Sequence, residues 1–98
     1  MGLTILLVDD DQILTEKTKN SLNWDSLGIG MVFTANNIHE AKGILKVYKV
    51  DILLCDVDMP MGSGLELVEW IREEGMEIKC IFLSSYANFT YAQKALRL

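Results

Sequence analysis

Apolar residues follow two patterns along the chain, and these patterns alternate from one end to the other. Short apolar runs occur at residues 3–8, 31–35, 51–55 and 78–83. None of these runs alternates between apolar and polar residues, as a strand with one exposed face would. Uninterrupted runs of this length are typical of parallel strands that are covered on both faces. We therefore expect four buried strands.

The segments between the runs repeat apolar residues every three or four positions, which predicts amphipathic helices. Start signals precede them: Asn37 forms a capping-box pair with Glu40, and Ser63 and Asn88 precede two further helices. Gly75 is a predicted helix stop. The expected inward-facing residues are Ile13, Leu14, Thr18 and Leu22; Ile38, Ala41, Leu45 and Tyr48; Leu67, Val68 and Ile71; and Phe89, Ala92 and Leu96.

This alternation of strands and helices predicts an α/β fold, and 98 residues are enough for one domain only. Such a series packs as a parallel sheet with helices on both faces and right-handed crossovers. If the first strand lies beside the third, the sheet is doubly wound and flavodoxin-like, with the order 2-1-3-4. Ligands of such sheets bind at the carboxyl ends of the strands, where the strand order reverses.

Oxygen-bearing side chains stand at three of these predicted carboxyl ends. Asp9, Asp10 and Asp11 follow the first run, whereas Asp56 follows the third and Ser84 follows the fourth. In the order 2-1-3-4, Asp9, Asp10 and Asp56 converge. Crowded carboxylates repel one another, so they must raise a pKa, become exposed or bind a cation. Oxygen ligands favour Mg²⁺ or Ca²⁺, and a site with open positions suits Mg²⁺. A metal beside a carboxylate and a hydroxyl suggests phosphoryl transfer to Asp56.

Each of these residues also has a purely structural interpretation. The acids from Asp9 to Asp11 could cap the first helix, because aspartate is a favoured N-cap residue. Asp56 could be a loop residue that bonds its own backbone, and Ser84 could be a turn hydroxyl. The conjunction of acids at two strand ends with a hydroxyl at a third favours a site over these separate interpretations.

Composition narrows the class of function. The net charge of −5 argues against a nucleic-acid surface, which needs clustered Lys and Arg. The apolar stretches fall far short of the ~20 residues that cross a bilayer, and the N-terminus lacks the features of a secretory signal. Cys55 and Cys80 lie within apolar runs at no metal-ligand spacing, which predicts reduced, buried thiols. We therefore expect a cytoplasmic protein that binds neither nucleic acid nor membrane.

The motifs resemble those of the receiver domain of two-component response regulators. "ILLVDDD" resembles that family's first strand with its acidic pair, here Asp9 and Asp10. "LLCDVDMPMGSGLEL" resembles its phosphoacceptor segment, and "IFLSSY" resembles the strand that ends in a switch hydroxyl. "SLNWDSLGIGMVFTANNIHEA" and "SSYANFTYAQKAL" are similar to receivers that often precede an AraC-type DNA-binding domain. The resemblance covers residues 1–98 and implies a CheY-like fold.

The resemblance implies a role for each candidate residue. Asp56 would accept a phosphoryl group from a sensor histidine kinase. Asp10 and Asp56 would ligate Mg²⁺ directly, Asp9 mainly through water, and Asp58 through its backbone carbonyl. Ser84 would bond the phosphoryl group and change the surface around the fourth helix, which would control a transcriptional output domain. The domain would then be a phosphoacceptor, with at most self-catalysed phosphoryl transfer and autodephosphorylation, and not an enzyme.

The chain departs from the family's pattern at its C-terminal end. It corresponds to four βα units, so residues 1–98 are an incomplete receiver domain that lacks the usual fifth strand and helix. The lysine of that fifth strand has no counterpart, because Lys79 and Lys94 stand at other positions. The fourth strand would then be an unpaired apolar edge, which favours a homodimer or a domain-swapped oligomer. The alternative is that the chain is a piece of a longer protein.

Two other functions stay open. The missing lysine is compatible with a pseudo-receiver, an interaction module that works without phosphorylation. Asp56 and Asp58 also form the Asp-x-Asp of aspartate-dependent phosphatases of the haloacid dehalogenase kind. Against that function, Met59 and Pro60 follow where those phosphatases have a small hydroxyl residue. The sequence predicts no particular kinase, signal or output domain.

Overall fold

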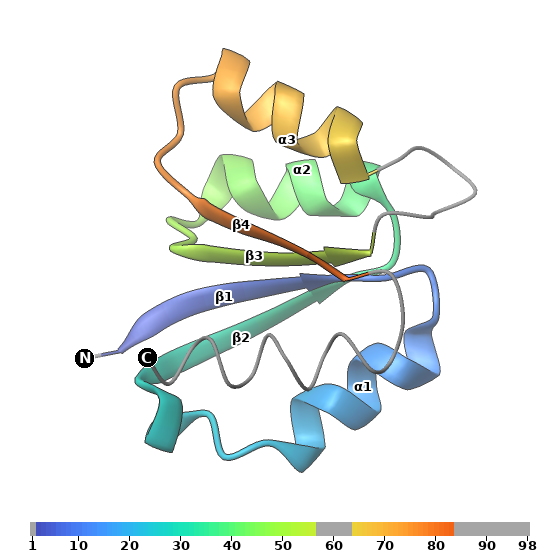
Figure 1. Ribbon diagram of the computed structural model, residues 1–98, viewed down its shortest axis with the longest axis vertical. Coiled ribbons are helices and arrows are strands. Elements are labelled where there is room, and N and C mark those ends of the chain that lie inside the picture. Colours follow the sequence, from blue (N-terminus) through green and yellow to red (C-terminus); the bar gives the residue numbers. More distant parts are fainter. Residues whose placement is uncertain (1, 57–63, 84–98) are drawn as a thin grey trace.

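The computed structural model describes residues 2–56 and 64–83 (Figure 1). Its sheet has four strands, β1 (Leu3–Val8), β2 (Ile29–Ala35), β3 (Ile52–Asp56) and β4 (Lys79–Leu83). Their order is β2-β1-β3-β4 and every pairing is parallel, which confirms the predicted fold class. β2 begins earlier than the predicted run because Ile29 is buried and pairs with Leu3.

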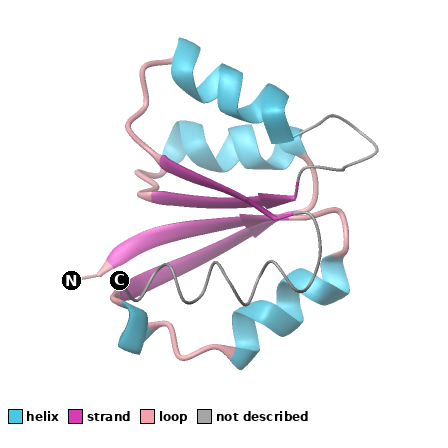
Figure 2. Cartoon of the chain, in the orientation of Figure 1, coloured by secondary structure: helices cyan, strands magenta, loops and turns pink. Residues whose placement is uncertain are grey.

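Helices cover both faces of this sheet (Figure 1, Figure 2). α2 (Ile38–Val47) and α3 (Gly64–Glu73) lie on one face, and α1 (Gln12–Ser21) lies on the other with the short 3₁₀ helix η1 (Asp25–Leu27). The sequence pattern did not predict η1, and the helix predicted after Asn88 lies outside the described residues. No helix in the described part of the chain is long and apolar enough to cross a membrane.

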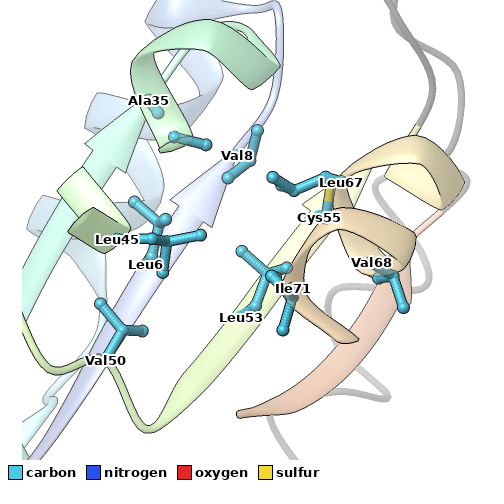
Figure 3. Packing of buried hydrophobic residues seen from close by; sticks show 11 residues of the cluster. Leu6, Val8, Ala35, Leu45, Val50, Leu53, Cys55, Leu67, Val68 and Ile71 are labelled. Carbon is cyan, nitrogen blue, oxygen red and sulfur yellow. The ribbon is translucent and has the colours of Figure 1, made fainter. Parts of the chain in front are cut away.

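The central strands β1 and β3 are buried on both faces, which explains why their sequences do not alternate. Toward α2 and α3, alternate strand residues pack against the two helices (Figure 3): Leu6, Val8, Leu53 and Cys55 meet Ala41, Leu45, Leu67, Val68 and Ile71. Toward α1, the intervening residues Ile5, Leu7, Ile52 and Leu54 form a second cluster with Ile29. Each buried aliphatic side chain stabilises the fold by about 1.5–3 kcal/mol, so β1 and β3 form its rigid centre.

Two predicted helix signals are confirmed. The Asn37 side-chain oxygen accepts the Glu40 N–H at 2.8 Å and so caps α2. Gly75 follows α3 with a φ of +71°, in the left-handed region that favours glycine. Its N–H donates to the Arg72 carbonyl, and the Met76 N–H donates to the Ile71 carbonyl, which closes the end of the helix.

The predicted inward face of α1 is partly wrong. Ile13 is 81% exposed, whereas Thr15 and Thr18 are buried against the sheet. Helix geometry accounts for the difference: successive residues are rotated by about 100°, so Ile13 lies about 200° around the helix from Thr15 and cannot share its face. The inward stripe runs through the two threonines and leaves Ile13 on the outer side.

Candidate functional site

The acids at the carboxyl ends of β1 and β3 converge. Val8 pairs with Cys55, so Asp9 and Asp56 leave the sheet beside each other. Asp9, Asp10 and Asp56 each offer a carboxylate oxygen, and these oxygens all lie within 4.8 Å of one another. The ends of β1 and β3 therefore lie side by side, as predicted.

The loop after β1 divides its three acids between two tasks. Asp11 caps α1, since its side-chain oxygen accepts the Leu14 N–H at 3.0 Å. Asp9 is partly buried, and its Oδ1 accepts the Asp11 N–H at 3.0 Å. Asp10 lies exposed between them. The capping interpretation thus holds for Asp11, and it leaves the carboxylates of Asp9 and Asp10 directed to the cluster.

The electrostatics of the cluster favour a cation. The pKa of Asp9 is raised from 3.8 to about 6, mainly by burial; the Asp11 N–H lowers it, and the neighbouring Asp10 and Asp56 carboxyls raise it. A raised pKa means that the surroundings disfavour the charged carboxylate, and a bound cation would stabilise it. Three hard oxygen donors that meet at one exposed point suit Mg²⁺, which keeps several waters and needs few protein ligands.

Comparison with known families decides what kind of domain carries this cluster. Residues 5–98 match the sequence profile of the response regulator receiver domain. The chain belongs to this family. The predicted resemblance to the receiver family is thereby confirmed.

Proteins similar to this receiver domain include transcriptional regulators. The uncharacterized transcriptional regulatory protein YesN of Bacillus subtilis is 33% identical over 93 residues, which are 95% of this chain and 25% of YesN. This chain spans 25–36% of the length of YesN and other curated relatives. A two component transcriptional regulator AraC from Clostridium phytofermentans has a TM-score of 0.78 at 31% identity, over 92% of this chain and 73% of that one.

The REC domain of AraT, a response regulator from Geobacillus stearothermophilus, has a similar fold. Its TM-score is 0.76 at 32% identity, and the match covers 99% of this chain and 75% of that one. Both solved structures therefore share the overall fold of this receiver domain.

Tight packing lies directly beneath Asp56 in the receiver domain. The Cys55 thiol donates to the Asp56 carbonyl at 3.3 Å, and burial raises its pKa to about 12. A Cβ on Gly64 would stand 2.8 Å from the Asp56 carbonyl oxygen and 2.9 Å from the Cys55 sulfur. The start of α3 therefore approaches Asp56 as closely as a backbone without a side chain allows. The predicted burial is confirmed for Cys55, while Cys80 is only partly buried.

The receiver domain also contains a polar contact that the sequence motifs did not reveal. Asn36 follows β2 directly, and its side-chain amide donates to the Asp9 carbonyl at 3.0 Å. The sequence did hold an indication of this contact, because Asn36 directly follows the second apolar run as Asp9 directly follows the first. Asn36 belongs to none of the acidic or hydroxyl motifs, so the motifs provided no reason to select it.

The remaining predicted residues divide into two groups. Asp58, Ser84 and Lys94 lie outside the described residues. Lys79 is the first residue of β4 and pairs with Ile52, the first residue of β3. It therefore stands at the opposite end of the sheet from Asp56, in agreement with its having no predicted role at the site.

Proposed function

We propose that this receiver domain accepts a phosphoryl group on Asp56 from a sensor histidine kinase, with Mg²⁺ bound at the acidic cluster. The convergence of the Asp9, Asp10 and Asp56 carboxylates within 4.8 Å is the observation that supports the proposal. Family membership supports the kinase as the donor. The protein would work as a cytoplasmic phosphoacceptor.

The transfer is a displacement at phosphorus. A carboxylate oxygen of Asp56 forms the new P–O bond while the P–N bond of the kinase phosphohistidine breaks. The departing imidazole nitrogen keeps the electron pair and takes up a proton. β3 holds Asp56 at its last position, so the nucleophile is rigid and its carboxylate still reaches the surface.

The other acids would hold the metal. Asp10 and Asp56 would ligate Mg²⁺ directly, and Asp9 would do so mainly through water. Bound Mg²⁺ would offset the repulsion between the incoming phosphoryl group and the carboxylates. The backbone carbonyl of Asp58 as a further ligand and the Ser84 hydroxyl as the switch are proposed from the family pattern alone.

We extend the proposal to the output. The similarity to YesN and to a transcriptional regulator of the AraC kind supports a transcriptional role for the protein that carries this domain. In that protein, phosphorylation of Asp56 would bias a surface around the fourth helix between two states. The domain itself would contact the kinase and the output domain, and it would not bind nucleic acid directly.

Incubation with acetyl phosphate and Mg²⁺, followed by intact-mass spectrometry, tests the proposal. The chain should gain a single phosphoryl group, and Asp56→Asn should gain none. Asp51→Asn is the matched control, because it makes the same change at the opposite end of the sheet and should be labelled like the wild type. Labelling that needs no Mg²⁺ or persists in Asp56→Asn would contradict the proposal.

The same chain separates the alternative functions. A pseudo-receiver would neither be labelled by acetyl phosphate nor respond to beryllofluoride with Mg²⁺ in NMR spectra. An aspartate-dependent phosphatase would hydrolyse p-nitrophenyl phosphate through many turnovers, whereas a receiver is labelled stoichiometrically.

The predicted homodimer or domain-swapped oligomer remains a prediction. Within the described sheet β4 pairs only with β3. Its Ile81 and Phe82 are partly buried, so the strand keeps some apolar surface. Light scattering that shows a monomer at high concentration would contradict it.

A further inference from the structure

A side chain continues the hydrogen-bonded ladder between β1 and β2 beyond the last strand residues. The Asp9 N–H donates to the Ala35 carbonyl at 3.1 Å. In a parallel ladder, the next bond would come from a backbone N–H of the neighbouring strand to the Asp9 carbonyl. The chain has turned away by then, because Asn37 caps α2. The side-chain amide of Asn36 supplies the bond instead, with Nδ2 3.0 Å from the Asp9 carbonyl oxygen.

Asn36 is itself held by two helices. Its backbone N–H donates to the Glu40 carboxylate of α2 at 2.8 Å. Its Nδ2 also lies 3.4 Å from the Thr15 hydroxyl of α1, which donates to the Gln12 carbonyl at 2.9 Å. Thr15 is only 4% exposed, so this hydroxyl is a fixed partner and not a mobile surface group. Asn36 therefore connects β1, α1 and α2 at one point.

The segment that this network fixes carries two of the three clustered acids. Asp9 supplies the carbonyl that Asn36 bonds, and the carboxylate of the same residue faces Asp10 and Asp56. Three carboxylates this close repel one another. A backbone without anchors would relax by moving the β1 loop away from β3. The bond from Asn36 opposes that movement from the side of β2.

We infer that Asn36 and Thr15 are positioning residues, which clamp the Asp9 carbonyl and so hold the loop of Asp9, Asp10 and Asp11 in the arrangement that binds Mg²⁺. The inference deepens the proposed function and rests on it for the identity of the ion. Neither residue would touch the metal or the phosphoryl group. Each acts through the backbone of Asp9.

Two variants remove the clamp in different ways. Asn36→Ala deletes the amide, and Thr15→Val keeps the shape of the buried side chain but deletes its hydroxyl. Hydrogen-bond partners of metal ligands typically contribute tenfold or more to affinity. Each variant should therefore weaken Mg²⁺ binding about tenfold in an NMR titration. In the metal-free chain, the Asp10 and Asp11 amides should exchange with solvent faster than in the wild type.

Matched controls separate positioning from a general loss of stability. Thr18→Val is the control for Thr15→Val, because it alters a buried threonine one turn further along α1. Asn20→Ala is the control for Asn36→Ala, because it alters an exposed asparagine. Both should leave Mg²⁺ affinity and amide exchange unchanged. Thr15→Ser restores a hydroxyl and should restore both. In the double variant of Asn36→Ala and Thr15→Val, the losses should be less than additive, because both residues serve one contact.

Unchanged Mg²⁺ affinity and unchanged Asp10 and Asp11 exchange in Thr15→Val would overturn the inference, even if Asn36→Ala does not fold. Equal effects from Thr18→Val would overturn it as well. If the wild-type chain binds no Mg²⁺, the proposed function fails. The exchange of the two amides in the metal-free variants would still show whether the clamp holds the loop.

Discussion

The two ends of the β-sheet use aspartates in opposite ways. At the amino ends of the strands, Asp51 stands just before β3, and its side chain, its N–H and its carbonyl all form hydrogen bonds. Its Oδ2 accepts the Thr4 N–H at 2.8 Å, and its own N–H donates to the Thr4 carbonyl at 2.8 Å. Its carbonyl accepts the Lys79 N–H at 3.0 Å. The Asp51 carboxylate thus links β1 to the start of β3, and the Asp51 backbone carbonyl links the start of β3 to β4.

At the carboxyl ends of the strands, three carboxylates face one another instead. The burial of Asp9 and the neighbouring charges of Asp10 and Asp56 raise its pKa, which means that the folded chain disfavours its charged form. An aspartate at the amino end thus stabilises the fold, and the cluster at the carboxyl end works against it. Groups held together against their mutual repulsion indicate a function, and the function that we propose for these is the binding of a cation and a phosphoryl group.

The largest effect is expected at the carboxyl end, where packing leaves no room. Gly64→Ala would place a Cβ 2.8 Å from the Asp56 carbonyl oxygen and 2.9 Å from both the Cys55 sulfur and the Phe82 ring. Because overpacking of this kind forces the backbone to move, we expect a loss of about 3 kcal/mol in the free energy of unfolding. Urea denaturation measures it.

Gly43→Ala is the control for that prediction. Gly43 lies within α2, and a Cβ there would meet nothing within 4 Å. Alanine favours the helix over glycine, so this variant should be more stable than the wild type by about 0.5–1 kcal/mol. A free energy of unfolding that is no lower in Gly64→Ala than in Gly43→Ala would show that the packing beneath Asp56 is not tight.

At the amino end, Asp51→Ala should cost about 2 kcal/mol, because the partly buried Thr4 N–H loses a charged acceptor. Asp51→Asn keeps an oxygen in the same place and should recover most of that loss. Denaturation curves compare the three chains. Mg²⁺ affinity should stay unchanged in both variants, and a weakened affinity would show that the two ends are not independent.

Buried strands were the part of the fold that the sequence predicted best. β1 and β3 are covered on both faces, so nearly all of their positions are apolar and the run itself marks the element. The convergence of Asp9, Asp10 and Asp56 followed from the strand order 2-1-3-4. The inward face of α1 was harder to predict: Ile13 is apolar yet exposed, because the buried stripe runs through the polar residues Thr15 and Thr18.

Two features lay beyond the sequence pattern for physical reasons. The 3₁₀ helix η1 is too short to show a repeating apolar pattern. Local hydrogen bonds join Ser26 within η1 to Asn23, which lies just before it. The bond from Asn36 to Asp9 joins residues 27 positions apart, and it depends on the rotamer of one amide. Such a contact becomes visible only when the strands are in register.

Mg²⁺ should stabilise the chain through the carboxyl end alone. At tenfold the dissociation constant, binding to the folded state adds about 1.4 kcal/mol to the free energy of unfolding. The wild type and Asp51→Ala should both show this gain, and Asp56→Asn should not. Thermal or urea denaturation with and without Mg²⁺ measures it. An equal gain in Asp56→Asn would place the ion elsewhere.

The smallest effect concerns the charge of Asp9. Folding raises its pKa from the ordinary 3.8 to about 6, so the folded state binds the proton more tightly. Asp9 therefore favours folding below pH 3.8, and this contribution is lost as the pH rises through 6. A pKa change of this size would correspond to about 3 kcal/mol for a fully buried group. Solvent screens the partly buried carboxylate, so about 1 kcal/mol is expected.

Asp9→Asn removes this charge and keeps the oxygen that accepts the Asp11 N–H. Without Mg²⁺, the variant should be more stable than the wild type by about 1 kcal/mol at neutral pH, and the difference should vanish below pH 3.8, where Asp9 is protonated in both states. Urea denaturation at the two pH values measures this. Added Mg²⁺ should reverse the order at neutral pH, because the ion stabilises the chain that keeps all three carboxylates more than the chain that keeps two. A variant less stable than the wild type without Mg²⁺ would mean that Asp9, like Asp51, serves the fold.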